Sequence, residues 1–205
     1  MKTAVIDCTR SKNVKDLVNA VSPFTEYVVV RFESIGQDYE PDKSVGALVI
    51  SGSGHRSADP KDRDKFRNVT DLIKRFDGPV LGVCFAHQLI GHAYGAGLST
   101  LAKPIYDKFE HVRILETDEI FNGYKCGATI PLVEYHNDYV MRQGLSEAGF
   151  TLLADSQSCE VEAIKYNSKP LYGVQFHAER YRIRKEEHRE GLKIFENFYK
   201  LVVKR

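Results

Sequence analysis

The sequence predicts an α/β protein with a mainly parallel, doubly wound sheet flanked by helices and a smaller antiparallel strand extension in its second half. Over residues 1–95, short apolar runs alternate with segments whose apolar residues recur every three or four positions. Such alternation is typical of strand-helix-strand units, in which the strands lie parallel. After residue 100, strand-like runs predominate until the last segment of the chain, which indicates the extension.

The first half contains four expected strands and three expected helices. The segment 27–30 is rich in β-branched and aromatic residues, as strands are, and the segment 62–76 gathers its large apolar residues on one helical face. A glycine-rich turn at 51–54 is expected at the carboxyl edge of the sheet, where open α/β sheets bind ligands. The expected strands are 3–6, 26–32, 45–50 and 80–83, and the expected helices are 12–21, 62–76 and one that begins after Cys84.

The second half is expected to add strands and to end in a helix. In the segment 160–166, Glu162 and Lys165 interrupt the apolar residues, so this strand is expected to face solvent on one side. No repeat, low-complexity segment or linker separates the halves, so residues 1–205 are expected to form a single domain. The expected strands are 108–115, 130–135, 160–166 and 170–176, and the expected final helix is 187–202.

Composition and charge exclude several classes of function. The chain has 205 residues and a formal net charge of +1, so nothing suggests a nucleic-acid or membrane surface. The N-terminus meets a charge at Asp7 and has no long apolar region, which predicts neither a signal peptide nor a membrane anchor. The turn at 51–54 lacks the phosphate-loop and dinucleotide-binding glycine patterns, so a nucleotide site is not favoured.

Cysteine and histidine usage predicts a reduced, cytoplasmic protein without a structural metal or cofactor. The four cysteines form no C-x-x-C pair, and in the absence of an export signal free thiols are the default. The seven histidines lack the paired spacing of metal ligands. The cysteines are Cys8, Cys84, Cys126 and Cys159.

Cys84 lies where an apolar strand changes into a helix. At such a turn, the free N–H groups of the helix stabilise a thiolate, which makes the cysteine a better nucleophile at neutral pH. Gly82 leaves room for the bend because it has no side chain. The pattern is the cysteine form of a nucleophile elbow. A buried structural cysteine at the end of a core strand is the alternative interpretation.

A second apolar strand, 170–176, delivers His177 at its end, and Glu179 follows two residues later. In an extended chain, residues i and i+2 point to the same side, so Glu179 can approach one ring nitrogen while the other faces a nucleophile. This is the arrangement of a base and its orienting carboxylate in catalytic triads. A surface pair of histidine and glutamate is the alternative interpretation.

These two segments resemble those of the class I, or triad, glutamine amidotransferases. The segment 82–88 matches the family's nucleophile segment, and 173–179 matches its histidine and glutamate segment. The resemblance runs from the first strand to the last helix and implies a flavodoxin-like fold. The segment 159–164 followed by 169–177 is similar to the closing region of the amidotransferase subunit of two-subunit GMP synthases.

The resemblance implies a glutaminase that uses Cys84 as nucleophile, His177 as acid and base, and Glu179 as the group that orients His177. Glutamine would be hydrolysed to glutamate and ammonia through a γ-glutamyl thioester. The ammonia would pass to a separate ATP-dependent synthetase (ATP pyrophosphatase) subunit, as in purine biosynthesis. No cofactor is implied.

The resemblance also assigns an oxyanion hole and a substrate site. Main-chain N–H groups of Phe85 and of the Gly52-Ser53 turn would stabilise the oxyanion, and the side chain of Gln88 would contact the substrate. The segment Tyr135-His136-Asn137 would give main-chain contacts to the amino and carboxylate groups of glutamine.

The sequence departs from the family pattern at four places. Ala86 stands where the family usually has glycine, Ser53-Gly54 replaces glycine and proline in the oxyanion loop, and Ala178 replaces proline. The first strand is followed by 7–11 (Asp-Cys-Thr-Arg-Ser) in place of a turn with glycine and glutamine. Two alternatives to such a glutaminase partner therefore stay open, namely a stand-alone γ-glutamyl hydrolase or peptidase with the same triad, and a non-catalytic regulatory relative.

Overall fold

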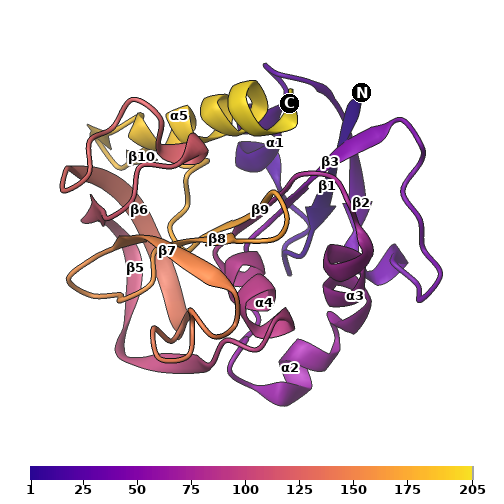
Figure 1. Cartoon of the computed structure of the whole chain (residues 1–205), viewed down its shortest axis with the longest axis horizontal. Helices are drawn as coiled ribbons and strands as arrows, with labels where there is room; N and C mark the ends of the chain where they lie inside the picture. Colours follow the sequence, from indigo (N-terminus) through magenta and orange to yellow (C-terminus); the bar gives the residue numbers. More distant parts are fainter. Residues whose placement is uncertain (205) are drawn as a thin grey trace.

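A mixed sheet of nine strands runs through the molecule in the order β2-β1-β3-β4-β9-β8-β7-β5-β6 (Figure 1). The computed structural model describes residues 1–204. The first five strands in this order pair in parallel. This is the predicted doubly wound part, and its strands are β1 (Lys2–Asp7), β2 (Glu26–Arg31), β3 (Val45–Ile50), β4 (Val80–Val83) and β9 (Leu171–Val174).

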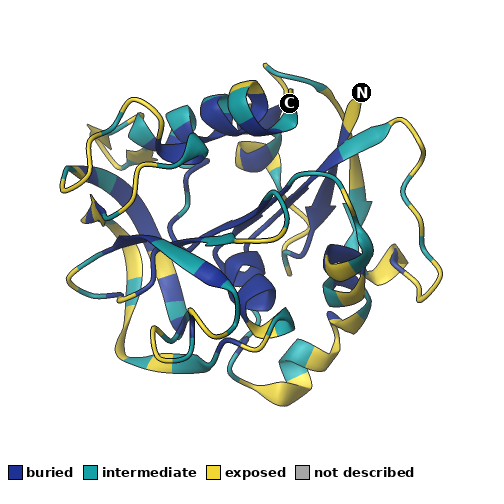
Figure 2. Ribbon diagram, viewed as in Figure 1, coloured by how far each residue is buried: buried dark blue, intermediate teal, exposed yellow. Residues whose placement is uncertain are grey.

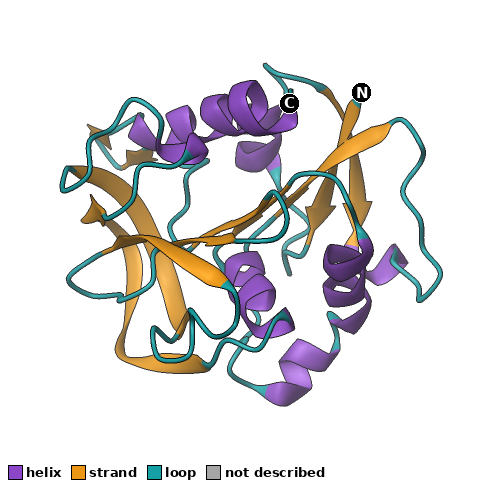
Figure 3. Ribbon diagram, viewed as in Figure 1, coloured by secondary structure: helices purple, strands orange, loops and turns teal. Residues whose placement is uncertain are grey.

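The other four strands form the predicted antiparallel extension, which continues the same sheet beyond β9 (Figure 3). A separate two-stranded hairpin lies near the end of the chain. The four strands are β5 (Leu98–Ile114), β6 (Thr129–Val140), β7 (Phe150–Asp155) and β8 (Ala163–Tyr166), and the hairpin strands are β10 (Arg182–Ile183) and β11 (Glu186–Glu187).

Helices cover both faces of the central parallel strands, so β1, β4 and β9 are mostly dark blue, or buried, in Figure 2, whereas the edge strand β2 is exposed to partly exposed. The helices α1 (Lys15–Val21) and α5 (Glu190–Asn197) pack on one face. The helices α3 (Arg67–Arg75) and α4 (Phe85–Ala93) pack on the other. Because side chains alternate along a strand, Val5 joins the first core and Ile6 the second. No helix within residues 1–204 is long and apolar enough to cross a membrane.

The expected helix 62–76 is divided into α2 (Pro60–Asp64) and α3. Phe66 lies at the break and is fully buried. Its ring stacks on Phe32, with centroids 4.3 Å apart, and meets Phe85 edge-on at 4.7 Å. The helix is therefore interrupted where the Phe66 ring packs into the core. Asp59 caps the start of α2 by accepting a hydrogen bond from the main chain of Lys61.

The second half differs from the expectations in three respects, which are an additional strand, the burial of the segment 160–166 and the start of the final helix. The strand β7 was not expected, because Leu152, Leu153 and Ala154 favour helices as much as strands. The expectation that 160–166 faces solvent is wrong: β8 begins only at Ala163, and the Glu162 side chain is fully buried. The final helix begins at Glu190, after the hairpin, and continues as a π-helical segment, Phe198–Val203.

We expect Gly82→Ala to destabilise the fold by about 1–3 kcal/mol, the usual cost of overpacking a core. A Cβ at Gly82 would lie 2.5 Å from Ile90 Cδ1 and 3.0 Å from the main chain of Ala86. Urea unfolding measures the change. Gly36→Ala is the matched control, because no atom lies within 4 Å of its added Cβ; equal losses in both variants would contradict the prediction.

Candidate active site

Cys84 occupies the turn between β4 and α4, with φ 52° and ψ −107°. A positive φ is strained for a residue other than glycine, and such strain is common at functional sites. The turn is held in place because the Cys84 N–H donates to the Val174 carbonyl of β9 at 2.7 Å. Because β4 and β9 are parallel neighbours, Cys84 and the residues after Val174 lie at the same edge of the sheet.

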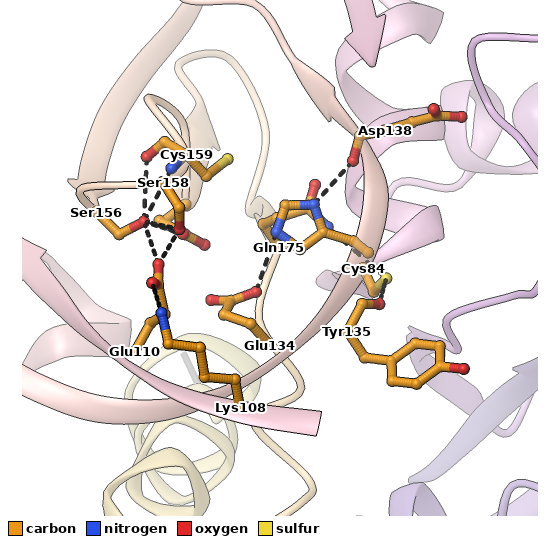
Figure 4. Close-up of polar contacts among 12 residues, drawn as sticks. Cys84, Lys108, Glu110, Glu134, Tyr135, Asp138, Ser156, Ser158, Cys159 and Gln175 are labelled. Carbon is orange, nitrogen blue, oxygen red and sulfur yellow. Dashed lines mark hydrogen bonds and ion pairs between the residues drawn. The ribbon is translucent and has the colours of Figure 1, made fainter. Parts of the chain in front are cut away.

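The Cys84 thiol lies among polar groups despite being buried. It donates to the main-chain oxygen of Tyr135 at 3.6 Å, and the Gln175 amide donates to the sulfur at 3.7 Å. Figure 4 shows the sulfur beside this Tyr135 oxygen. The same Gln175 side chain accepts a hydrogen bond from Gln88 at 2.9 Å, so the sulfur is connected to a buried polar chain.

The structure brings His177 and Glu179 to Cys84. His177 Nδ1 and Glu179 Oε1 are 2.7 Å apart, and the ring also interacts with the Cys84 side chain. Burial lowers the pKa of His177, but the charges of Glu179 and Cys84 outweigh it, so the pKa lies well above its ordinary value. A protonated imidazole is therefore favoured beside the Cys84 sulfur.

The turn after β3 lies against these residues. A Cβ at Gly52 would be 3.1 Å from His177 Cε1 and 3.3 Å from Cys84 Cβ, so glycine allows the close approach. Ser51 Oγ accepts from the Cys8 N–H and donates to the Gly52 carbonyl, which fixes this peptide. The Ser53 hydroxyl lies 2.8 Å from His55 Nδ1. The unusual serine side chain thus has its own partner outside the triad.

Two cavities meet beside Cys84 and His177. One, of about 210 Å³, is lined by Cys84 and Phe85 and by the four residues expected to contact substrate, which are Gln88, Tyr135, His136 and Asn137. The other, of about 410 Å³, is lined by His177 and Glu179 and by residues 9–11 and 13–17. Both include Ser53, Gly54 and Tyr135 in their walls.

Gln88 and His136 also serve the scaffold around the smaller cavity. Gln88 Nε2 donates to the Asp138 carbonyl at 2.6 Å and to Gln175 Oε1 at 2.9 Å. His136 Nδ1 lies 3.1 Å from the same Asp138 carbonyl. Burial lowers the pKa of His136, so its neutral form is favoured.

Sequence reasoning missed an ion pair in the wall of the smaller cavity. Arg56 donates to both carboxylate oxygens of Asp138 through Nε, and through Nη2 at 2.6 Å. The Ala58 N–H and the Thr100 hydroxyl complete the set around this buried carboxylate. Burial raises the pKa of Asp138, but these donors outweigh it and hold the pKa below its ordinary value. Arg56 and Asp138 are 82 residues apart, so no local sequence motif predicts that they form an ion pair.

We expect Asp138→Asn to cost about 1–3 kcal/mol of stability at neutral pH, because hydrogen bonds to a charged group are lost. A carboxylate with a lowered pKa stabilises the fold above its ordinary pKa and loses that contribution as the pH falls through the lowered value. Urea unfolding should therefore show that the difference in the free energy of unfolding between wild type and variant becomes smaller toward acid pH. Asp64→Asn, in a largely exposed pair with Arg67, is the control. A difference in the free energy of unfolding that stays constant with pH would contradict the lowered pKa of Asp138.

Comparison with known proteins shows which family this chain resembles. A family model, glutamine amidotransferase class-I, matches residues 4–200. The glutamine-hydrolyzing GMP synthase of Methanothermobacter thermautotrophicus has a subunit that is 40% identical over 132 residues, which are 64% of this chain and 65% of that subunit. The corresponding subunit from Sulfolobus acidocaldarius is 36% identical over 167 residues, 78% of this chain and 82% of its own length.

Solved structures agree with this comparison. A Thermoplasma acidophilum protein described as a candidate GMP synthase subunit superimposes with a TM-score of 0.81 at 25% identity, covering 97% of this chain and 92% of its own. A Thermotoga maritima glutamine amidotransferase shares the fold, with a TM-score of 0.71 at 15% identity over 88% of this chain and 77% of its own. The resemblance found in the sequence is confirmed, and the chain belongs to the class-I glutamine amidotransferase family.

Proposed function

We propose that this chain hydrolyses glutamine and supplies ammonia to a separate synthetase subunit, as the glutamine-hydrolysing subunit of a two-subunit GMP synthase. The observation that carries the proposal is the meeting of Cys84, His177 and Glu179 at one edge of the sheet, with His177 Nδ1 2.7 Å from Glu179. The names of the relatives support glutamine as substrate and a synthetase as partner.

In the proposed reaction, His177 takes the thiol proton of Cys84, and the sulfur attacks the side-chain amide carbon of glutamine. The C–N bond then breaks as His177 gives its proton to the leaving nitrogen, so ammonia leaves and a γ-glutamyl thioester remains on Cys84. Water attacks the thioester while His177 accepts its proton. Glutamate then leaves with an oxygen from water, and the cysteine is regenerated.

The N–H groups at the start of α4 and in the turn after β3 are the proposed oxyanion donors. Phe85 is the first residue of α4, and the first N–H groups of a helix have no partner within it. Gly52 lies against the Cys84 side chain, which puts the turn within reach of the reacting carbon. Each such donor typically contributes about 2.7–4 kcal/mol of transition-state stabilisation.

The two cavities have different proposed roles. The smaller one holds the glutamine, because its wall includes Cys84, Gln88 and the segment Tyr135-His136-Asn137. The larger one is lined by His177 and Glu179 and carries Arg10, Lys15 and Arg180 in its wall. We assign the synthetase to this side, so that ammonia leaves the triad without crossing the glutamine site.

The test is to measure ammonia release by the purified chain, alone and with the synthetase subunit from the same organism and its nucleotide substrates. The proposal predicts labelling of Cys84 by a glutamine-like alkylating analogue, slow turnover alone and faster turnover with the partner. Fast hydrolysis of γ-glutamyl compounds without a partner would instead identify a stand-alone hydrolase. Neither labelling nor turnover would identify a non-catalytic relative.

A further inference from the structure

Four ionisable or metal-ligating side chains meet in the interior, beneath the substrate segment. Glu134 and His136 come from β6, and Cys159 and Glu162 come from the loop between β7 and β8. All four are at least nine-tenths buried. In the view of Figure 4, Glu134 lies between Cys84 and the hydrogen-bonded group of Glu110, Ser156 and Ser158.

Several polar atoms of this cluster have no hydrogen-bond partner outside it, although the Glu134 and Glu162 carboxyl groups interact with each other. They are both carboxylate oxygens of Glu134, Nε2 of His136 and one oxygen of Glu162. His136 Nε2 lies 3.3 Å from Glu134 Oε2. Because His136 Nδ1 faces a main-chain carbonyl at 3.1 Å, it carries the ring proton, and Nε2 presents a lone pair to the cluster.

The cluster contains two carboxyl groups and no cationic side chain. The nearby Lys108 ammonium is bound to Glu110 at 2.7 Å. In the part of the chain that the structure describes, no lysine or arginine forms an ion pair with Glu134 or Glu162. Buried charges are normally paired or bound to a metal ion. The lone pair of the His136 nitrogen and the oxygens of the two carboxyl groups are atoms that can bind a metal ion.

We propose that this cluster is a binding site for a divalent transition metal ion, with Zn²⁺ as the best match. His136 Nε2, Cys159 Sγ and a Glu162 oxygen all lie within 4.8 Å of one another. Glu134, whose Oε2 lies 3.3 Å from His136 Nε2, would supply the fourth ligand. Nitrogen, sulfur and carboxylate ligands in a closed tetrahedron are typical of structural zinc. On binding, Cys159 gives up its thiol proton to solvent.

The surroundings match those of a metal site. Two ligands about 2.0–2.1 Å from a tetrahedral zinc lie about 3.3–3.4 Å apart, which is the separation of His136 Nε2 and Glu134 Oε2. The ligand atoms of Cys159 and Glu162 lie within 4.8 Å of His136 Nε2 and move closer on binding. The orienting contacts that metal ligands usually make are present: Ser156 donates to Glu162 Oε1 at 2.7 Å, and the Asp138 carbonyl holds His136.

The site is structural in this proposal and differs from the triad. It joins the β6 segment that carries Tyr135 to the loop before β8, so metal binding stabilises one wall of the substrate cavity. The sequence prediction of no metal rested on spacing. These ligands are 23 or more residues apart between β6 and the loop, so spacing carries no signal of the site.

The test uses the whole protein, purified without chelators and then stripped and titrated with Zn²⁺ or Co²⁺. We expect one equivalent of zinc by elemental analysis, a rise in melting temperature on adding Zn²⁺, and a thiolate-to-Co²⁺ charge-transfer band. Cys159→Ser should lose the band and at least tenfold in affinity, and Glu134→Gln should lose affinity. Cys126→Ser is the matched control, because Cys126 is exposed. This variant should retain the charge-transfer band and the metal affinity of wild type.

Melting curves without metal show whether each variant is folded, so a loss of metal binding in a folded variant is attributable to the missing ligand. Absence of stoichiometric metal, with no Zn²⁺-dependent change in melting temperature, would overturn the proposal and leave protonated carboxyl groups as the resting state. A charge-transfer band that persists in Cys159→Ser would also overturn it.

Discussion

Replacing Cys84 by alanine is expected to abolish glutamine hydrolysis, with a fall in kcat on the order of 10⁴-fold or more. The sulfur is the only proposed nucleophile, and without it no thioester forms. The fold should remain, because alanine keeps the buried Cβ that contacts Gly52. Ammonia release, measured beside circular dichroism, tests both parts of the expectation.

Labelling separates the role of Cys84 from those of the other thiols. A glutamine-like alkylating analogue should modify wild type and a Cys126→Ala variant once, and should leave Cys84→Ala unmodified. Cys8 and Cys159 are buried, and burial raises the pKa of both thiols above the ordinary value, so neither competes. Residual hydrolysis within tenfold of wild type in Cys84→Ala would contradict the mechanism.

The central strands of the parallel half could be predicted from the sequence because they are buried on both faces. Such strands appear as continuous apolar runs, as in 45–50 and 80–83, and β3 and β4 have these bounds. The antiparallel half was harder, since buried polar residues there imitate a solvent face. Glu162 is the example: its charge suggested exposure, yet tertiary contacts bury it completely.

The same distinction applies to the site. Cys84, Gln88, His177 and Glu179 lie in two short segments with recognisable spacing, so the sequence named them. Arg56 and Asp138, or Glu134 and Glu162, meet only after distant strands have paired. Burial raises the pKa of Glu134 to about 8, and that environment cannot be read from local spacing.

Glu179→Gln is expected to lower kcat by on the order of 10³–10⁴-fold, comparable to the loss when a serine-protease triad has its carboxylate replaced by an amide. An amide N–H facing His177 Nδ1 favours the wrong tautomer, and the negative charge is lost. That charge helps to raise the pKa of His177, so the pKa should fall in the variant.

The pH dependence gives the sign of this effect. His177 must be protonated to give a proton to the leaving ammonia, so activity is lost as the pH rises through its pKa. The basic limb of the kcat profile should therefore move to lower pH in Glu179→Gln, and iodoacetamide should alkylate Cys84 more slowly at neutral pH. Gln in place of Glu also replaces the carboxylate that lies 2.7 Å from His177 Nδ1 with a neutral amide.

The chain offers a matched control in a second histidine–glutamate pair, His188 and Glu186, whose ring nitrogen and carboxylate are 3.0 Å apart at the surface. Glu186→Gln removes the same charge from the same kind of contact, without a neighbouring thiol. We expect its kcat and its pH profile to match wild type. If both variants shift the profile equally, the shift reflects overall charge and Glu179 has no special role; if only Glu179→Gln shifts it, the carboxylate acts through His177.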